Sequence, residues 1–194
     1  MRRVVLVSLL LLGAGFLRER AGRRRAERSL GERLRFETLL TDHTATFSRV
    51  SAADVDREIE RALRHIADFL GVDWGSFAEY STDERTARTT HAWVGEGVDR
   101  QPTRRGVEEL PWILGRLQRG EVVRFSRLDE LPDGPAVVDR GTLRALGIMS
   151  HVAVPLIVEG VVMGAVAFST LRRERAWRDE FVQRLRLLGE VFVN

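Results

Sequence analysis

The sequence has 194 residues, of which 44% are hydrophobic and 30% are charged, which is typical of one globular domain with extensions. All 31 basic residues are arginine, and the absence of cysteine excludes disulfides, thiolate metal sites, cysteine nucleophiles and thioether-linked chromophores. Residues 1–35 hold 10 Arg and 3 acidic residues, a net charge of +7, whereas residues 36–194 hold 21 Arg and 25 acidic residues, a net charge of −4. The basic excess therefore belongs to the N-terminus and does not indicate a nucleic-acid-binding domain.

Residues 4–17 form an apolar run that is followed by six arginines between Arg18 and Arg28. As a helix the run is about 21 Å long, which is short for the ~30 Å hydrocarbon core of a membrane. The arginine cluster after it favours a membrane anchor whose C-terminal side stays in the cytoplasm. A signal peptide cleaved near residues 13–15 and a non-inserting or truncated remnant are the alternatives.

Residues 18–47 are rich in Arg, Glu, Ala and Leu, which favour a helix. Their apolar positions follow no clean heptad, so a two-stranded coiled coil and a connecting helix packed on the next domain both remain open. A second helix is predicted over residues 54–70, where Val55, Ile59, Leu63, Ile66 and Leu70 recur at helical spacing. The stretch 51–54 has the pattern of a capping box, with Asp in place of Glu, and Gly71 ends the helix.

The middle of the chain alternates short strands with short helices. Residues 74–80 and 87–94 are predicted to form a hairpin, and residues 95–106 a loop. A short helix is expected from about Pro111 to Gly120, a strand over residues 121–126, a loop over 128–135, and another short helix over residues 139–146. The last part comprises a hairpin over residues 150–170 and a helix over about 175–193, with Trp177, Phe181 and Leu185 on one apolar stripe. Because this helix stops in the middle of its stripe, we expect the protein to continue beyond Asn194.

In the hairpin over residues 150–170, both the even-numbered and the odd-numbered positions are apolar. Since these two sets point to opposite faces, both faces of the sheet should be covered. This order of elements predicts an α+β fold with a central antiparallel sheet of about five to six strands. The terminal helices should cover one face, and loops and short helices between residues 95 and 147 should form a lid over the other, enclosing a small cavity. The expected division is a hydrophobic segment 1–17, a basic linker helix 18–47, a sensory domain 48–174 and a C-terminal helix 175–194.

At the hairpin the sequence resembles a known family. The pattern S-x-x-x-VPL-x-x-x-G-x-x-x-G-x-x-x-F, formed by Ser150, residues 154–156, Gly160, Gly164 and Phe168, is similar to the final hairpin of a GAF domain. GVDWGSFAEYS after the helix 54–70 resembles the GAF opening, and EVVRFSRLDELP with RALGI resembles the middle of GAF domains of bacterial sensor histidine kinases. The resemblance covers about residues 36–193 and implies a sensory or regulatory module, often dimeric, whose terminal helices continue into an output domain.

The resemblance also allows the family's ligand classes to be compared with this chain. Cyclic-nucleotide GAF domains carry an Asn-Lys-Phe-Asp-Glu set, which is incomplete here because the chain has no lysine. Covalent bilin attachment is excluded because there is no cysteine. Haem needs an inward histidine, for which only His91 and His151 lie on predicted strands, and haem is not expected. The cofactor therefore stays unknown.

Six residues are candidates for the wall of the pocket: Phe77, His91, Trp93, Trp112, Phe125 and His151. His91 and Trp93 are two apart and so share one strand face, where Trp93 could stack on a planar ligand and His91 could form a hydrogen bond to it. The alternative for Trp93 and Phe77 is plain core packing. The alternative for His91 is a position at a strand end, and for His151 a capped or exposed position at the start of its strand. For Trp112, ligand contact and lid packing are equally open.

No hydrolase, metalloprotease or P-loop motif is present, so no enzymatic activity is expected. The predicted function is the sensory input module of a membrane-tethered signalling protein such as a histidine kinase, at the cytoplasmic face of the inner membrane. The expected partners are a small ligand, a second copy bound through the terminal helices, and the membrane through residues 4–17 and the Arg18–Arg28 cluster, without nucleic acid. The alternative is a structural dimerisation module that binds no ligand.

Overall fold

The computed structural model describes residues 23, 27, 30–39, 41–47, 49–51, 53–81, 86–99 and 104–193. The chain divides into two compact units, Met1–Thr41 and Asp42–Asn194, and residues 30–39 of the first unit are helical. The apolar run 4–17 and all arginines of the Arg18–Arg28 cluster except Arg23 lie outside the described residues. Within those residues, the structure has no helix with the length and apolar character that a membrane span requires.

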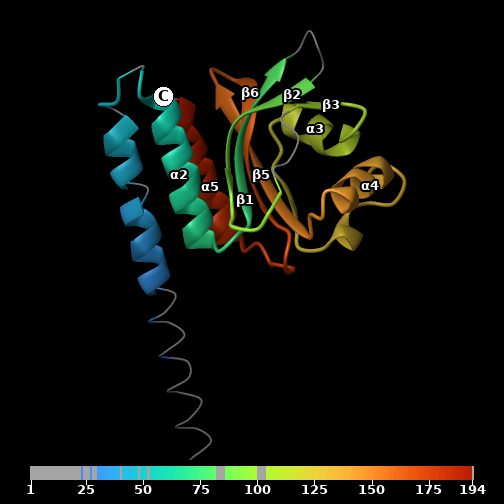
Figure 1. Ribbon diagram of the computed structural model, residues 1–194, viewed down its shortest axis with the longest axis horizontal. Coiled ribbons are helices and arrows are strands. Elements are labelled where there is room, and N and C mark those ends of the chain that lie inside the picture. The colour runs from blue at the N-terminus through green and yellow to red at the C-terminus, as the bar shows by residue number, and fades with distance from the viewer. Residues whose placement is uncertain are drawn as a thin grey trace, which may run out of the picture. The chain divides into compact units, whose positions relative to one another are not determined.

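The second unit contains a six-stranded antiparallel sheet with the strand order β3-β2-β1-β6-β5-β4 (Figure 1). The strands are β1 (Trp74–Ser81), β2 (Thr86–Val94), β3 (Arg104–Gly106), β4 (Val123–Phe125), β5 (Ser150–Val158) and β6 (Val161–Thr170). The predicted α+β class is therefore confirmed. The edge strand β3 falls in the segment that was expected to be a loop, because three residues are too few to show an alternating pattern.

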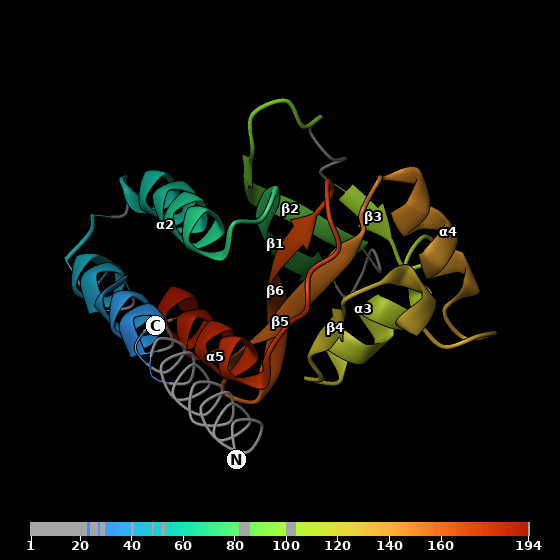
Figure 2. The ribbon, with the colours of Figure 1, turned by 90° about the horizontal axis from the view of Figure 1, so that it is seen from below.

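Helices cover both faces of the sheet. Helices α2 (Val55–Leu70) and α5 (Asp179–Val193) lie on one side, and α3 (Pro111–Gln118) and α4 (Val137–Ala145) lie on the other (Figures 1 and 2). We refer to α3 and α4 together as the lid. A 3-10 turn, Leu128–Glu130, lies in the predicted loop between them. Trp177 was expected within the C-terminal helix, but it precedes α5.

Helix α2 forms as its spacing predicts, with one side made of buried residues such as Leu63, Ile66 and Leu70. Gly71, at φ 60°, ends it in the left-handed region that glycine adopts readily. The predicted capping box is wrong. The Ser51 hydroxyl donates to the Asp54 carboxylate over 2.8 Å, and the Asp54 side chain accepts no hydrogen bond from a backbone N–H of the first turn of the helix.

The β5–β6 hairpin is buried on both faces from Ser150 to Leu156, as its sequence predicts. Its two faces differ in side-chain size. Val152, Val154, Leu156, Val166 and Phe168 lie on the side of α2 and α5, whereas Ala153, Ala165 and Ala167 face the lid. The bulky face fills the space under the helices, and the alanine face leaves space under the lid.

Candidate ligand cavity

A cavity of about 90 Å³ lies between the sheet and the lid. Its floor is made of short side chains from three neighbouring strands: Ser76, Ala78, Ala153, Ala165 and Ala167. Its roof is made of aliphatic side chains from the lid and the segments next to it: Leu110, Ile113, Leu114, Leu117, Leu143, Leu146 and Ile148. Packed layers are about 10 Å apart, so alanine and serine on the floor are too short to close the gap.

The lid is held together by buried polar contacts. The Asp139 carboxylate on α4, fully buried, accepts hydrogen bonds from the backbone N–H groups of Trp112 (3.2 Å) and Ile113 (2.9 Å). These are first-turn donors of α3 that its own N-cap residue, Leu110, cannot satisfy. The Thr142 hydroxyl on α4 also donates to the Glu109 carbonyl over 2.7 Å. The two short helices are therefore tied to each other as well as to the sheet.

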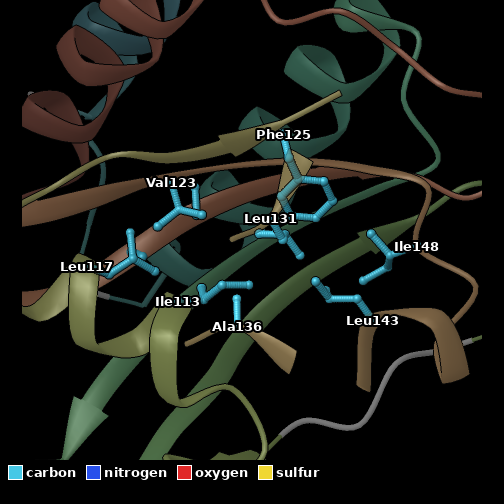
Figure 3. Packing of buried hydrophobic residues seen from close by; sticks show 10 residues of the cluster. Ile113, Leu117, Val123, Phe125, Leu131, Ala136, Leu143 and Ile148 are labelled. Atoms are coloured by element: carbon cyan, nitrogen blue, oxygen red, sulfur yellow. The ribbon is translucent and has the colours of Figure 1, made fainter. Parts of the chain in front are cut away.

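An apolar cluster joins the lid to the sheet on one side of the cavity. It contains Ile113, Leu117, Val123, Phe125, Leu131, Ala136, Leu143, Ile148, Ala153 and Ala165 (Figure 3). Val123 and Phe125 come from strand β4, and Ile113 and Leu117 come from α3. Four of the ten residues, Ile113, Leu117, Leu143 and Ile148, also line the cavity roof, so the cavity and the cluster share part of their packing.

His151 forms one end of the cavity. Its Nδ1 lies 2.8 Å from the Ser169 hydroxyl, and its ring stacks on Phe125 with centroids 5.7 Å apart. Burial lowers the pKa of His151 to about 4, so the ring is neutral at pH 7. Ser169 pairs across the ladder with Trp74, which lines the same end.

Tyr80 and Arg105 form the other end. Across the ladder Tyr80 on β1 is opposite Ala87 on β2, and Ala87 is opposite Arg105 on β3, so the three side chains form a row on the cavity face. Arg105 Nη1 donates to Glu109 Oε2 over 2.6 Å. Its Nη2 and the Tyr80 hydroxyl are buried and have no hydrogen-bond partner among the residues that the structure describes.

The electrostatics of this end follow from those contacts. The hydrogen bond from Arg105, together with one from the Gly106 backbone, holds the pKa of Glu109 below its usual range. Burial raises the pKa of the Tyr80 phenol, which therefore stays protonated near neutral pH. Both of these buried groups without a partner belong to residues that line the cavity, and both are hydrogen-bond donors at pH 7.

The six predicted pocket residues do not lie together. His151 lines the cavity, but Phe77, His91 and Trp93 lie on the opposite face of the sheet. His91 Nε2 is 3.1 Å from Asp56 Oδ1 on α2, and the His91 ring packs edge-on against Phe77. Trp93 is opposite Gly75 in the ladder, and a Cβ at Gly75 would point toward the Leu63 carbonyl of α2. Trp93 is therefore on the α2 side of the sheet.

The cause is a β-bulge in β2. Phe77 is opposite His91 while Ala78 is opposite Thr89, so Thr90 is an extra residue in the strand. An inserted residue reverses the parity of everything beyond it. Ala87 and Thr89 face the cavity, and without the bulge His91 and Trp93 would face it too. The expectation that the His91–Trp93 face lines the pocket is therefore wrong.

The two remaining candidates belong to the packing around the cavity. Phe125 is buried in the apolar cluster and packs against His151, which lines the cavity. Trp112 is partly buried against the same cluster, and the Arg116 guanidinium lies 5.1 Å from the centre of its ring. Neither lines the cavity in this structure.

Tyr80 and Arg105 were not predicted to line the cavity. A signal for Tyr80 was present, because positions 76 and 78 of its strand are small and share its parity. Small residues at alternate positions of a strand, together with the alanines of the final hairpin, indicate the face of the sheet on which a cavity is left open. Arg105 had no such signal, because its strand has only three residues.

Comparison with known proteins agrees with this architecture. The family model for the GAF domain matches residues 54–193. The phycocyanobilin-bound GAF domain from a cyanobacterial phytochrome is similar in structure, with a TM-score of 0.68, 13% identity and coverage of 81% of this chain and 91% of that one. No curated protein matches the sequence.

Two other solved structures are similar. The blue-light absorbing form of the Thermosynechococcus elongatus PixJ GAF domain has a TM-score of 0.56 and 15% identity, covering 80% of this chain and 84% of its own. The GAF domain from Acinetobacter phosphoenolpyruvate-protein phosphotransferase has a TM-score of 0.62 and 13% identity, covering 81% of this chain and 92% of its own. At these identities the likeness concerns the fold.

Proposed function

Because the chain belongs to the GAF domain family, we propose that it is the input module of a signal-transduction protein. In this proposal a small ligand binds in the cavity under the lid. Its binding favours one packing of the sheet against the terminal helices, which pass the change to an output domain such as a histidine kinase. A ligand shifts such an equilibrium only by its difference in affinity for the two states.

The observation that supports this proposal is a continuous set of contacts from the cavity to α5. His151, on the cavity wall, stacks on Phe125 of β4. The Phe125 carbonyl accepts a hydrogen bond from the Trp177 indole over 3.2 Å, just before α5 begins. Arg124, also on β4, reaches Asp179, the first residue of α5, over 2.5 Å. A ligand that moves His151 therefore acts on the start of the C-terminal helix.

The size and chemistry of the cavity favour a small ligand. Several of the similar structures hold bilins, but this chain has no cysteine for a thioether bond. A space of about 90 Å³ holds more than a single water molecule and is below the ~300–1,000 Å³ of drug-sized pockets. A tetrapyrrole would need the lid to move outward.

The proposal also includes a membrane tether and a second copy of the chain. The tether is supported by the apolar run 4–17 and the Arg18–Arg28 cluster, which suit a hydrocarbon core and anionic headgroups. It places the GAF domain at the cytoplasmic face of the inner membrane. In this proposal two copies associate through their terminal helices and pass the signal on together.

Native mass spectrometry of the purified chain tests ligand binding and dimerisation together. We expect a dimer that carries a small molecule, and we expect Ala165→Leu, which fills the cavity floor, to lose that molecule and keep the dimer. Met163→Leu is the matched control, since Met163 lies on the same strand and is 53% exposed.

A ligand-free dimer in which Ala165→Leu only raises the melting temperature would instead support the structural dimerisation module. A strict monomer with no bound molecule would contradict both functions.

A further inference from the structure

We propose that the cavity takes a small organic acid, whose carboxylate binds between Tyr80 and Arg105 and whose apolar body lies over the alanine floor toward His151. The proposal rests on the ligand-sensing function and specifies the chemistry of the same site. Its starting point is the pair of buried donors, Tyr80 Oη and Arg105 Nη2, that have no partner in the described part of the chain. Buried polar groups are nearly always hydrogen-bonded, so two of them on one cavity wall indicate a missing acceptor.

The row formed by Tyr80, Ala87 and Arg105 gives that acceptor a place. The two donor side chains start from β1 and β3, the strands on either side of β2. Neighbouring strands are only about 4.8 Å apart, so both donors start close to β2. Between them stands Ala87, whose single methyl group leaves the space above it open. An acceptor above Ala87 can be reached from both sides.

The charges favour a carboxylate over a neutral acceptor. Arg105 is the one charged side chain among the described residues that line the cavity, and His151 is neutral at pH 7. The partner of Arg105, Glu109, has a side chain that is 39% exposed and therefore hydrated, whereas the free edge of the guanidinium is buried. A guanidinium edge and a phenol together match the two oxygens of a carboxylate.

The rest of the cavity determines the body of the acid. Apart from Thr89, Ser76 and His151, the side chains between the Tyr80–Arg105 end and the Trp74 end are apolar. With about 90 Å³ of space, the body is a single ring or a short branched chain. Benzoate and phenylacetate are suitable probes, and benzamide and phenylacetamide are their neutral counterparts of nearly equal shape.

Isothermal titration of the chain with each acid and its amide tests the proposal. In the wild-type protein at least one acid should bind about tenfold or more tightly than its amide, since charge-assisted hydrogen bonds are the stronger ones. Arg105→Gln should weaken acid binding by roughly ten- to hundredfold and weaken amide binding much less, because the amide has no charge for the guanidinium to pair with. Tyr80→Phe should weaken it by about fivefold.

Arg88→Gln is the matched control, because Arg88 neighbours Ala87 on β2, points to the other face and pairs with Glu79. It should leave acid binding unchanged. The comparison of acid with amide needs only the wild-type protein, so it stands even if a variant fails to fold.

Three results would overturn the proposal: equal binding of acid and amide, acid binding that Arg105→Gln does not weaken, or no binding of either acid at millimolar concentration. Equal binding of acid and amide leaves the cavity as a ligand site and removes only the carboxylate end. The wider sensory function is judged separately, by whether the native protein carries a molecule that Ala165→Leu displaces.

Discussion

His151 shows how strongly this fold determines the state of one side chain. The ring is 7% exposed, with one nitrogen beside the Ser169 hydroxyl and one face on Phe125. Burial disfavours the imidazolium and lowers the pKa to about 4. The unfolded chain therefore takes up the proton first, near pH 6.5, and the stability that the neutral ring provides is lost as the pH falls from there toward 4.

We expect the free energy of unfolding to fall by about 2–3 kcal/mol between pH 7 and pH 4.5 on account of His151. Urea denaturation of the wild type and of His151→Gln at both pH values measures this as the difference between the two pH dependences. Burial also lowers the pKa of His43, but that contribution is common to both proteins and cancels. Equal pH dependence in the two proteins would show that His151 does not titrate in this way.

At this scale the sequence predicts the site only in part. His151 was named as a candidate because it is one of only two histidines on predicted strands. His91, Trp93 and Phe77 were placed on the wrong face because the bulge at Thr90 shifts the strand by one residue. Nothing in the residues TTHAW marks that bulge. Parity is reliable along an unbroken strand, and one inserted residue is enough to reverse it.

The elements were predicted more completely than the side chains. Helix α2 was found because its apolar positions recur at helical spacing over 16 residues. The β5–β6 hairpin was found because two long apolar runs flank Glu159 and Gly160. The turn of the hairpin has positive φ at both Glu159 (49°) and Gly160 (83°), as a two-residue type I′ loop requires. The elements that were missed, β3 and the turn at Leu128–Glu130, have three residues each.

The pairing of β1 with β6 depends on Gly164. A Cβ at this position would lie 2.1 Å from the Ala78 carbonyl oxygen of β1, a backbone atom that can move only with its strand. We therefore expect Gly164→Ala to destabilise the protein by about 3 kcal/mol or more, measured by urea denaturation.

Gly141→Ala in α4 is the matched control, because a Cβ there meets nothing within 4 Å. Since alanine favours a helix more than glycine does, this variant should stabilise the protein by up to about 1 kcal/mol. If both variants unfolded at the same urea concentration as the wild type, the close approach of the two strands would be refuted.

On the scale of the whole molecule, the sheet separates two regions with different packing. On one face valine, leucine and phenylalanine fill the space under α2 and α5, and on the other face alanine and serine leave a cavity under the lid. The order of motifs along the sequence was sufficient to identify the GAF family. The link between the cavity and α5 could not be predicted, because it joins Phe125 to Trp177, 52 residues apart, through a backbone carbonyl that no sequence pattern reveals.

That link predicts that Trp177→Phe separates the cavity from the C-terminal helix. Phenylalanine keeps an aromatic ring in place but removes the indole N–H that binds the Phe125 carbonyl. Filling the cavity with Ala165→Leu should change the hydrogen exchange of the first turns of α5 in the wild-type background and have little effect on them in Trp177→Phe. Trp112→Phe, on the lid, is the matched control, and in that background the response of α5 should persist. An α5 response of equal size in the Trp177→Phe background would mean that the cavity acts on the helix by another route, such as the packing of β5 against α5.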